Sequence, residues 1–134
     1  MANNISREEW LVSDTRIASE DIAAGTGVVL DSDGKAEYGS AGGAIYGIAG
    51  RAAKTGEAFP VVQLGLTPVI VATAGSLSAA DKVMVQANTG KFITATSTNT
   101  SQASIAPGSP DVGANGDRAN VWVNVFNPET IPGG

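Results

Sequence analysis

The stretch from Asp31 to Gly34, which reads DSDG, holds the residues best suited to chemistry in this chain. Two closely spaced carboxylates before a glycine are typical of the start of a calcium-binding loop, because Ca²⁺ prefers oxygen ligands. The rest of that pattern is missing, since no third acidic residue precedes Gly34 and no glutamate stands at the distal position. We therefore predict a β-hairpin turn here and assign no metal site.

Other chemical motifs are weaker. The glycine-dense segment 39–50 could cradle a phosphate, but it lacks the Gly-Lys-Ser/Thr ending and no convincing helix follows it. The acidic pairs at residues 8–9 and 20–21 could carry out acid–base catalysis, although adjacent acidic residues in arms and loops are usually solvated. A serine nucleophile would need a lysine or an acidic base, and no serine and lysine stand at a recognisable spacing. We predict no catalytic residue, no cofactor and no small-molecule substrate.

Histidine and cysteine are both absent from the 134 residues. The chain therefore lacks the commonest general base and metal ligand at neutral pH, and it forms no disulfide. Its net charge is −5 and its eight basic residues are dispersed, so no run of them could neutralise a line of phosphates. We predict a protein that is not an enzyme and has no nucleic-acid or membrane partner. Because the sequence shows neither a signal peptide nor a membrane-spanning stretch, we expect synthesis in the cytoplasm.

Glycines recur at short intervals from residue 25 onward and leave room for short strands rather than helices. The clearest strand is 119–126, in which Val121, Val123 and Val125 alternate with polar or aromatic residues, as in a strand with one buried face. The other strand candidates are 27–31, 35–38, 44–49, 58–64, 68–72, 82–86, 91–96 and 103–106. We predict an all-β domain, built as a small β-barrel or β-sandwich of short strands.

A block of strands and turns occurs twice in the sequence. Both copies contain a β-hairpin with a Gly-Lys turn, at Gly34-Lys35 and at Gly90-Lys91. The aligned ranges are 22–38 with 77–93, 47–49 with 104–106, and 55–64 with 115–124. The second copy has ANTG where the first has DSDG, which favours a turn over a calcium site. A long period that occurs twice predicts a pseudo-symmetric barrel or sandwich.

Composition divides the chain into three parts. The predicted parts are an extended N-terminal arm at 1–14, a β-domain at 15–127 with pseudo-repeat halves at about 17–65 and 69–126, and a C-terminal tail at 128–134. In the arm, Ser6 and Glu9 stand at capping-box spacing, so we expect at most one or two helical turns after them. The low-complexity stretch 97–117 is expected to be a long surface loop carrying a short strand, and the tail is expected to be extended and weakly ordered.

Aromatic residues stand in two unusual places. Trp10 lies in the polar arm, and Trp122 and Phe126 share a strand face with two asparagines. Large apolar groups in such places often mark contact surfaces. The alternative is that they cover the edges of a small core.

The order of these segments resembles that of the capsid cement, or head decoration, proteins of tailed bacteriophages. The resemblance rests on IAAGTGVVLDSDGKAEY, YGIAGRAAKTGEAFPVVQLG, TPVIVATAGSLSAADKVMVQANTGKFITA and GDRANVWVNVF, and it covers most of residues 17–126. It implies an all-β domain that forms a homotrimer and binds the major capsid protein on the outer capsid surface of the virion, where it stabilises the head at threefold and quasi-threefold positions. The TSQASIAPGSPDVGAN insertion and the NPETIPGG ending depart from the family pattern and leave the details of the outer face open.

On the basis of this resemblance we expect the arm to be mobile until the capsid orders it, with Ile5, Trp10 and Leu11 as apolar anchors. We expect Trp122 or Phe126 to lie in or near the subunit interface. The main alternative is a trimeric β-module of a tail fibre or receptor-binding structure, which would recognise a glycan or cell surface. Shallow aromatic and Asn/Asp-rich loops would favour that alternative, as would binding of the isolated domain to a glycan array.

Overall fold

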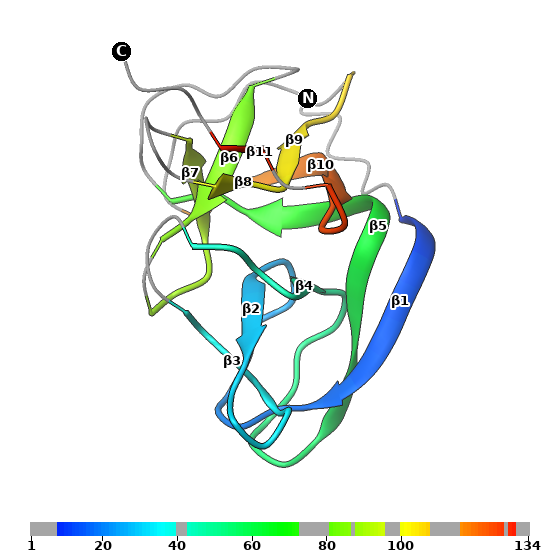
Figure 1. The fold of residues 1–134 in the computed structure, drawn as a ribbon, viewed down its shortest axis with the longest axis vertical. Coiled ribbons are helices and arrows are strands. Elements are labelled where there is room, and N and C mark those ends of the chain that lie inside the picture. Colours follow the sequence, from blue (N-terminus) through cyan, green and yellow to red (C-terminus); the bar gives the residue numbers. More distant parts are fainter. Residues whose placement is uncertain are drawn as a thin grey trace.

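The computed structural model describes residues 8–39, 43–72, 81–86, 88–95, 100–107, 116–127 and 129–130. These residues form strands joined by turns (Figure 1), and nothing among them forms a helix suited to crossing a membrane. The strands are β1 (Glu9–Ile17), β2 (Gly27–Leu30), β3 (Ala36–Glu37), β4 (Gly47–Ala49), β5 (Ala58–Ile70), β6 (Lys82–Val85), β7 (Phe92–Thr94), β8 (Thr100–Ser101), β9 (Ala103–Ile105), β10 (Arg118–Asn124) and β11 (Glu129–Thr130). The prediction of an all-β domain is confirmed.

One curled antiparallel sheet contains most of the described strands, in the order β3-β2-β4-β5-β10-β9-β6-β7. β5 is the longest of them and passes through both halves of the molecule (Figure 1). One edge of β5 pairs with β1, and the other pairs first with β4 and then with β10. A separate small sheet pairs β8 with β11, so two residues of the predicted tail are paired, while residues 128 and 131–134 lie outside the described ranges.

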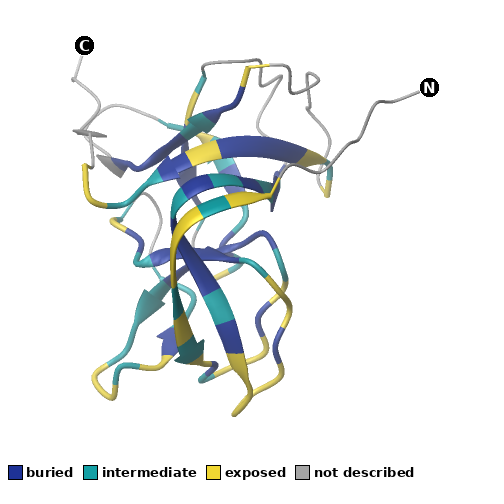
Figure 2. Cartoon of the chain, turned by 90° about the vertical axis from the view of Figure 1, so that its right-hand side faces the viewer, coloured by how far each residue is buried: buried dark blue, intermediate teal, exposed yellow. Residues whose placement is uncertain are grey.

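Buried and exposed side chains alternate along the strands, and the buried ones form the core (Figure 2). In β10, Val121 and Val123 are fully buried while Trp122 between them is exposed, as the alternating pattern predicts. One core cluster contains Ile45, Ile48, Val62, Val69, Val71, Val83, Val85, Phe92, Ala103, Ile105, Ala119, Val121 and Val123, and a second contains Ala18, Ile22, Val28, Ala36, Ala49, Ala53, Phe59 and Val61. Because most of these side chains are β-branched or small, they pack well on a pleated surface.

The internal repeat is visible in the order of the strands. Outward from the contact between β5 and β10, the order β4, β2, β3 on one side matches β9, β6, β7 on the other. The first half of β5 pairs with β1, and β10 pairs with the second half of β5 in the same way. β5 therefore ends one repeat and begins the next, and the predicted pseudo-repeat is confirmed.

Single hydrogen bonds also recur in the two repeats. The amide of Gly56 donates to the carbonyl of Ala18 at 2.8 Å, and the amide of Gly116 donates to the carbonyl of Val71 at 2.8 Å. The two glycines have nearly equal positive φ angles, of 90° and 93°. Glycine is favoured at both turns because other residues rarely adopt this backbone conformation.

One segment of the predicted repeat alignment is wrong by one residue. The amide of Gly50 donates to the carbonyl of Pro60, and the amide of Ala106 donates to the carbonyl of Asn120. Since Pro60 and Asn120 are equivalent in the aligned ranges, Gly50 corresponds to Ala106. Residues 47–49 therefore match 103–105 rather than 104–106, a difference that the similar triplets GIA and SIA conceal in the sequence.

The predicted break between strands 58–64 and 68–72 is also wrong, because β5 runs without interruption from Ala58 to Ile70. Gly65 in its middle has a φ of 137°, and a Cβ atom there would lie 2.1 Å from the carbonyl oxygen of Glu9. Glycine is needed here because the backbone of β1 passes very close to β5. The glycine thus marks a close approach of two strands and not the end of one.

The helical turn expected in the N-terminal arm is wrong for the described part of that arm. Residues from Glu9 to Ile17 form β1, which pairs with β5 from Leu66 back to Ala58. The predicted boundary after residue 14 falls inside this strand. Ser6 lies outside the described residues, and the cross-strand pairing of Glu9 overrides the weak local signal for a helix start.

Candidate functional site

Asp31 acts as a turn residue. Its carboxylate oxygen Oδ1 accepts hydrogen bonds from the amides of Asp33 at 2.8 Å and Lys35 at 2.9 Å. The amide of Gly34 donates to the carbonyl of Asp31 at 3.0 Å, and β2 pairs with β3 on either side of the turn. The hairpin interpretation of DSDG is confirmed. In the described part of the chain, no three or more aspartate, glutamate, histidine or cysteine residues are grouped so that they could hold a metal ion.

A cluster that the sequence analysis missed fastens β1 to the first repeat. Arg16 donates from Nε to Asp14 at 2.9 Å, from Nη2 to the hydroxyl of Tyr46 at 2.9 Å, and from Nη1 to the carbonyl of Gly34 at 3.3 Å. The Tyr46 hydroxyl donates to Asp14, and the guanidinium lies 4.9 Å from the centre of the Tyr46 ring. The spacing of Asp14 and Arg16 on one strand face is the only sequence signal for this cluster.

Hydrogen bonding sets the charge states in this cluster. The hydrogen bond from Tyr46 lowers the pKa of the Asp14 carboxyl below its ordinary value, and Arg16 lowers it further. The same hydroxyl, followed by Asp14, raises the pKa of Arg16. Asp14 and Arg16 are therefore both charged at neutral pH and hold β1 against the hairpin turn at Gly34.

The predicted anchors of the arm occupy different environments. Ile5 lies outside the described residues. Trp10 is half-buried and packs against the larger core cluster, with its ring on Gly50, where a Cβ atom would lie 2.7 Å from the indole. The guanidinium of Arg51 lies 4.7 Å from the Trp10 ring centre and forms an ion pair with Glu8 at 3.2 Å. Trp10 thus anchors β1 to the core through the inner face of the sheet.

Leu11 faces solvent because β1 is irregular at this point. The register of β1 against β5 shifts between Trp10 and Val12, as in a β-bulge, and Leu11 lies between these two residues. Its side chain is 65% exposed, and Val12 is exposed as well. Val12 pairs with Leu64, which places both on the outer face of the sheet. The N-terminal end of β1 therefore presents the apolar side chains of Leu11 and Val12 to solvent.

Trp122 lies on the same outer face, on the other side of β5. It pairs with Leu66 of β5 and with Ser104 of β9, and Ser104 pairs with Lys82 of β6. Residues directly opposite each other on neighbouring strands point to the same face of a sheet. The Trp122 side chain is 40% exposed among these cross-strand neighbours. The structure thus brings Trp122 and the N-terminal end of β1 onto the same face of the sheet.

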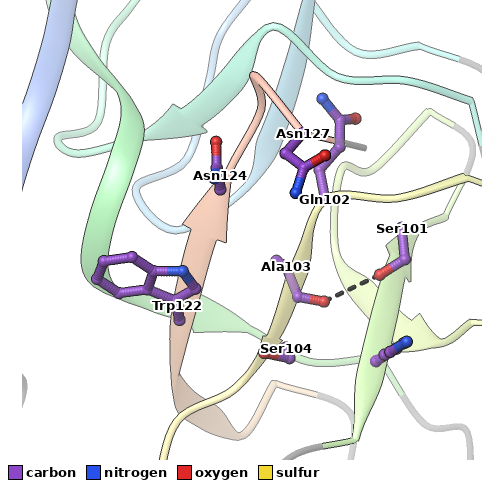
Figure 3. A pocket seen from close by; sticks show the side chains of 8 residues that line it. Ser101, Gln102, Ala103, Ser104, Trp122, Asn124 and Asn127 are labelled. Carbon is purple, nitrogen blue, oxygen red and sulfur yellow. Dashed lines mark hydrogen bonds between the residues drawn. The ribbon is translucent and has the colours of Figure 1, made fainter. Parts of the chain in front are cut away.

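A groove lies beside Trp122, between the outer face of β9–β10 and the turn after β10 (Figure 3). We call it the β9–β10 groove. Its lining residues are Lys82, Ser101, Gln102, Ala103, Ser104, Trp122, Asn124 and Asn127, and its volume is about 230 Å³. Sequence reasoning did not find it, because three separate segments contribute its side chains.

Phe126 follows β10 in an exposed turn and is 61% exposed. Its amide donates to the side-chain oxygen of Asn124 at 3.1 Å, which fixes the start of the turn. The structure therefore leaves both predicted interface residues, Trp122 and Phe126, accessible at the same end of β10. Their role in a subunit interface stays a prediction.

Comparison with known proteins agrees with this architecture. The sequence model of the phage cement protein family matches residues 5–124. The head fiber gp8.5 N base of bacteriophage phi29 has a similar fold, with a TM-score of 0.63 and 13% sequence identity over 85% of this chain and 94% of that chain. At this identity the likeness shows the fold alone, and no curated protein sequence matches the chain. Because the family match covers far more than half of its length, the chain belongs to the phage cement protein family.

Proposed function

We propose that the protein is a capsid decoration protein that binds the outer surface of the major capsid protein lattice as a homotrimer and stabilises the phage head. The family match over residues 5–124 carries this proposal, because it spans nearly the whole described sheet and makes the chain a capsid-associated component of the virion. The fold shared with a phi29 head fiber base supports it. A structural family of this kind also favours a non-enzymatic role. The tail-fibre alternative has less support, because the matching family is named for cement proteins.

Exposed apolar side chains at one end of the molecule support assembly with other chains. Leu11, Val12, Trp122 and Phe126 account for most of the large exposed apolar side chains among the described residues. Removing such surface from water contributes roughly 25 cal/mol per Å². A partner that binds only the folded chain adds to its stability, which matters for a domain with a modest core. We place Phe126 in the subunit interface and Trp122 near it, with its indole outside the contact.

The start of the chain is proposed to contact the capsid. Leu11 is the most exposed large apolar side chain described, and it is directed outward by the irregularity in β1. We propose that Ile5 and Leu11 contact the capsid directly. Trp10 supports that contact from within, since it fixes β1 on the core.

Co-sedimentation with expanded, undecorated capsids tests this proposal. The protein should sediment with the shells in a fixed ratio, and decorated shells should withstand higher temperatures than bare shells. Leu11→Ala should weaken binding about tenfold, since it removes an apolar contact worth roughly 1–2 kcal/mol. Ile17→Ala, a change at the far end of β1, should bind normally. Shells that neither retain the protein nor gain stability would contradict the proposal.

A further inference from the structure

Trp122 places an exposed aromatic side chain at one edge of the β9–β10 groove. The indole is exposed although its neighbours Val121 and Val123 are fully buried, so it lies on the surface of a rigid strand. Figure 3 shows the ring extending from β10 on the side away from β9, while Asn127 and Gln102 lie on the other side of β10. An aromatic face attracts the polarised C–H groups that line one face of a pyranose ring. This edge of the groove thus offers an aromatic surface on which a sugar can stack.

Neutral polar groups surround this surface and are free to bind a ligand. The side chains of Ser104 and Asn127 form no hydrogen bond with the described part of the chain. Asn124 uses its oxygen to accept from the amide of Phe126 at 3.1 Å, and its side-chain NH₂ group stays available. Hydroxyl and amide groups that converge from β9, β10 and the following turn can bond to several sugar hydroxyls at once.

The base of the groove is held in place by its own hydrogen bonds. The Gln102 side chain accepts from the amide of Ile45 at 2.6 Å and donates to the carbonyls of Ile45 at 3.0 Å and Val125 at 3.3 Å. The hydroxyl of Ser101 donates to the carbonyl of Val83 at 2.9 Å or that of Ala103 at 3.0 Å. These contacts tie β8–β9 to both repeats. The groove is therefore organised before a ligand arrives, which lowers the entropic cost of binding.

Charge and size decide the class of ligand. Among the lining residues there is one cation, Lys82, and no carboxylate, so the donor set suits neither a metal ion nor a phosphate clamp. The volume of about 230 Å³ is below the roughly 300–1,000 Å³ of drug-sized pockets. A single ring of a surface glycan fits these properties. We propose that the β9–β10 groove binds one pyranose ring of a neutral glycan, stacked on Trp122 and hydrogen-bonded by Ser104, Asn124 and Asn127.

Trp122 shares the outer face of the sheet with the start of β1, across β5, so this proposal requires the capsid contact to be confined to β1 and the residues before it. The proposal also requires Trp122 to stay open to solvent in the assembled trimer, so the subunit contact is then made around Phe126. A decorated head would carry many copies of the groove, and multivalent display raises the apparent affinity for a repeated glycan well above that of one site. Weak binding of a single ring is therefore compatible with firm attachment of a virion to a glycan surface.

The test is a titration of the full chain with methyl glucopyranoside, methyl galactopyranoside, N-acetylglucosamine and their β-linked disaccharides. Binding is followed by indole fluorescence and by amide chemical shifts, and an array of neutral glycans extends the set. At least one of these sugars should bind saturably and shift the amides of β9 and β10. Trp122→Ala and Asn127→Ala should each weaken that binding at least tenfold, Trp122→Phe should weaken it less, and Ile17→Ala should not change it.

Two results would overturn the proposal. One is the absence of saturable binding to every neutral glycan tested, and the other is unchanged binding by both Trp122→Ala and Asn127→Ala. Capsid co-sedimentation of the same variants separates this proposal from the proposed function. The Trp122→Ala variant should still bind capsids. If Trp122→Ala instead abolished trimer formation, Trp122 would belong to the subunit interface, and the proposal of an open groove would be wrong.

Discussion

At the scale of single residues, glycine decides how closely two strands approach. Gly65 lies where β1 crosses β5, and a Cβ atom at this position would lie 2.1 Å from the carbonyl oxygen of Glu9. Gly56 also has a positive φ, of 90°, but no atom outside its own chain neighbours lies within 4 Å of the position of its Cβ atom. Replacing each glycine by alanine therefore distinguishes the free-energy cost of a steric clash, at Gly65, from the cost of backbone strain alone, at Gly56.

Gly65→Ala should destabilise the protein by roughly 3 kcal/mol or more, because β1 must move away from β5. Gly56→Ala is the matched control and should cost only about 1 kcal/mol, the strain of an alanine with positive φ. Urea denaturation of the two variants measures both values. Equal losses would show that β1 does not approach β5 as closely as the structure indicates.

The carboxyl of Asp14 makes the stability of β1 depend on pH. Its pKa is lowered in the folded chain, first by the hydrogen bond from Tyr46 and then by Arg16. Such a group contributes stability at pH values above its unfolded pKa, and this contribution is lost as the pH falls through the folded pKa. Asp14→Asn should therefore lower stability at neutral pH and have a smaller effect in acid.

Denaturation of wild type and Asp14→Asn at a series of pH values measures this dependence. The difference in stability between them should shrink steadily from neutral to acidic pH. Asp33→Asn, an exposed change in the hairpin turn, serves as the control. A difference that stays constant across the pH range would show that the Asp14 carboxylate does not hold β1 in place.

At the scale of elements, β1 has two roles: it is a strand of the sheet, and it carries Leu11, which is proposed to contact the capsid. Deleting residues 1–14 would remove Glu9–Asp14 from the sheet and the packing of Trp10 on the core. A deletion of residues 1–7 leaves β1 complete. The shorter deletion is therefore the one that tests the arm without unfolding the domain.

The deletion of residues 1–7 should weaken capsid binding at least tenfold, since it removes Ile5, while the urea midpoint changes little. Combining it with Leu11→Ala should abolish co-sedimentation with capsids. The same deletion combined with Ile17→Ala is the control. Full binding by the first double variant would exclude a capsid contact at the start of the chain.

Strands with a regular pattern could be predicted from the sequence, and irregular ones could not. The alternation in β10 identifies its buried valines directly, because a strand with one buried face has a period of two residues. β1 has no such pattern, since Leu11 and Val12 are both exposed around its irregularity. The β9–β10 groove could not be predicted, because only the sheet order brings Lys82, Ser104 and Trp122 together.

At the scale of the whole molecule, the two repeats form one sheet that is joined through β5. The repeats differ where interactions with other chains are proposed. β1 adds an exposed apolar end to the first repeat, and the turn after β10 adds Phe126 to the second. Both features lie outside the core clusters, so they are available for assembly.

Analytical ultracentrifugation at micromolar concentration should show a homotrimer. Phe126→Ala should raise the concentration needed for trimer formation at least tenfold, as expected for an aromatic residue at an interface. The stability of the monomer fold should stay close to that of wild type, because the side chain is exposed. A monodisperse monomer of wild type at this concentration would exclude the trimer.

Imaging of expanded, undecorated capsids after mixing with the purified protein tests the central claim most directly. Electron cryomicroscopy should show added density on the outer surface at the threefold and quasi-threefold positions of the lattice, in trimers at full occupancy. Bare threefold positions at saturating protein, or density confined to the tail, would contradict a role as a capsid decoration protein.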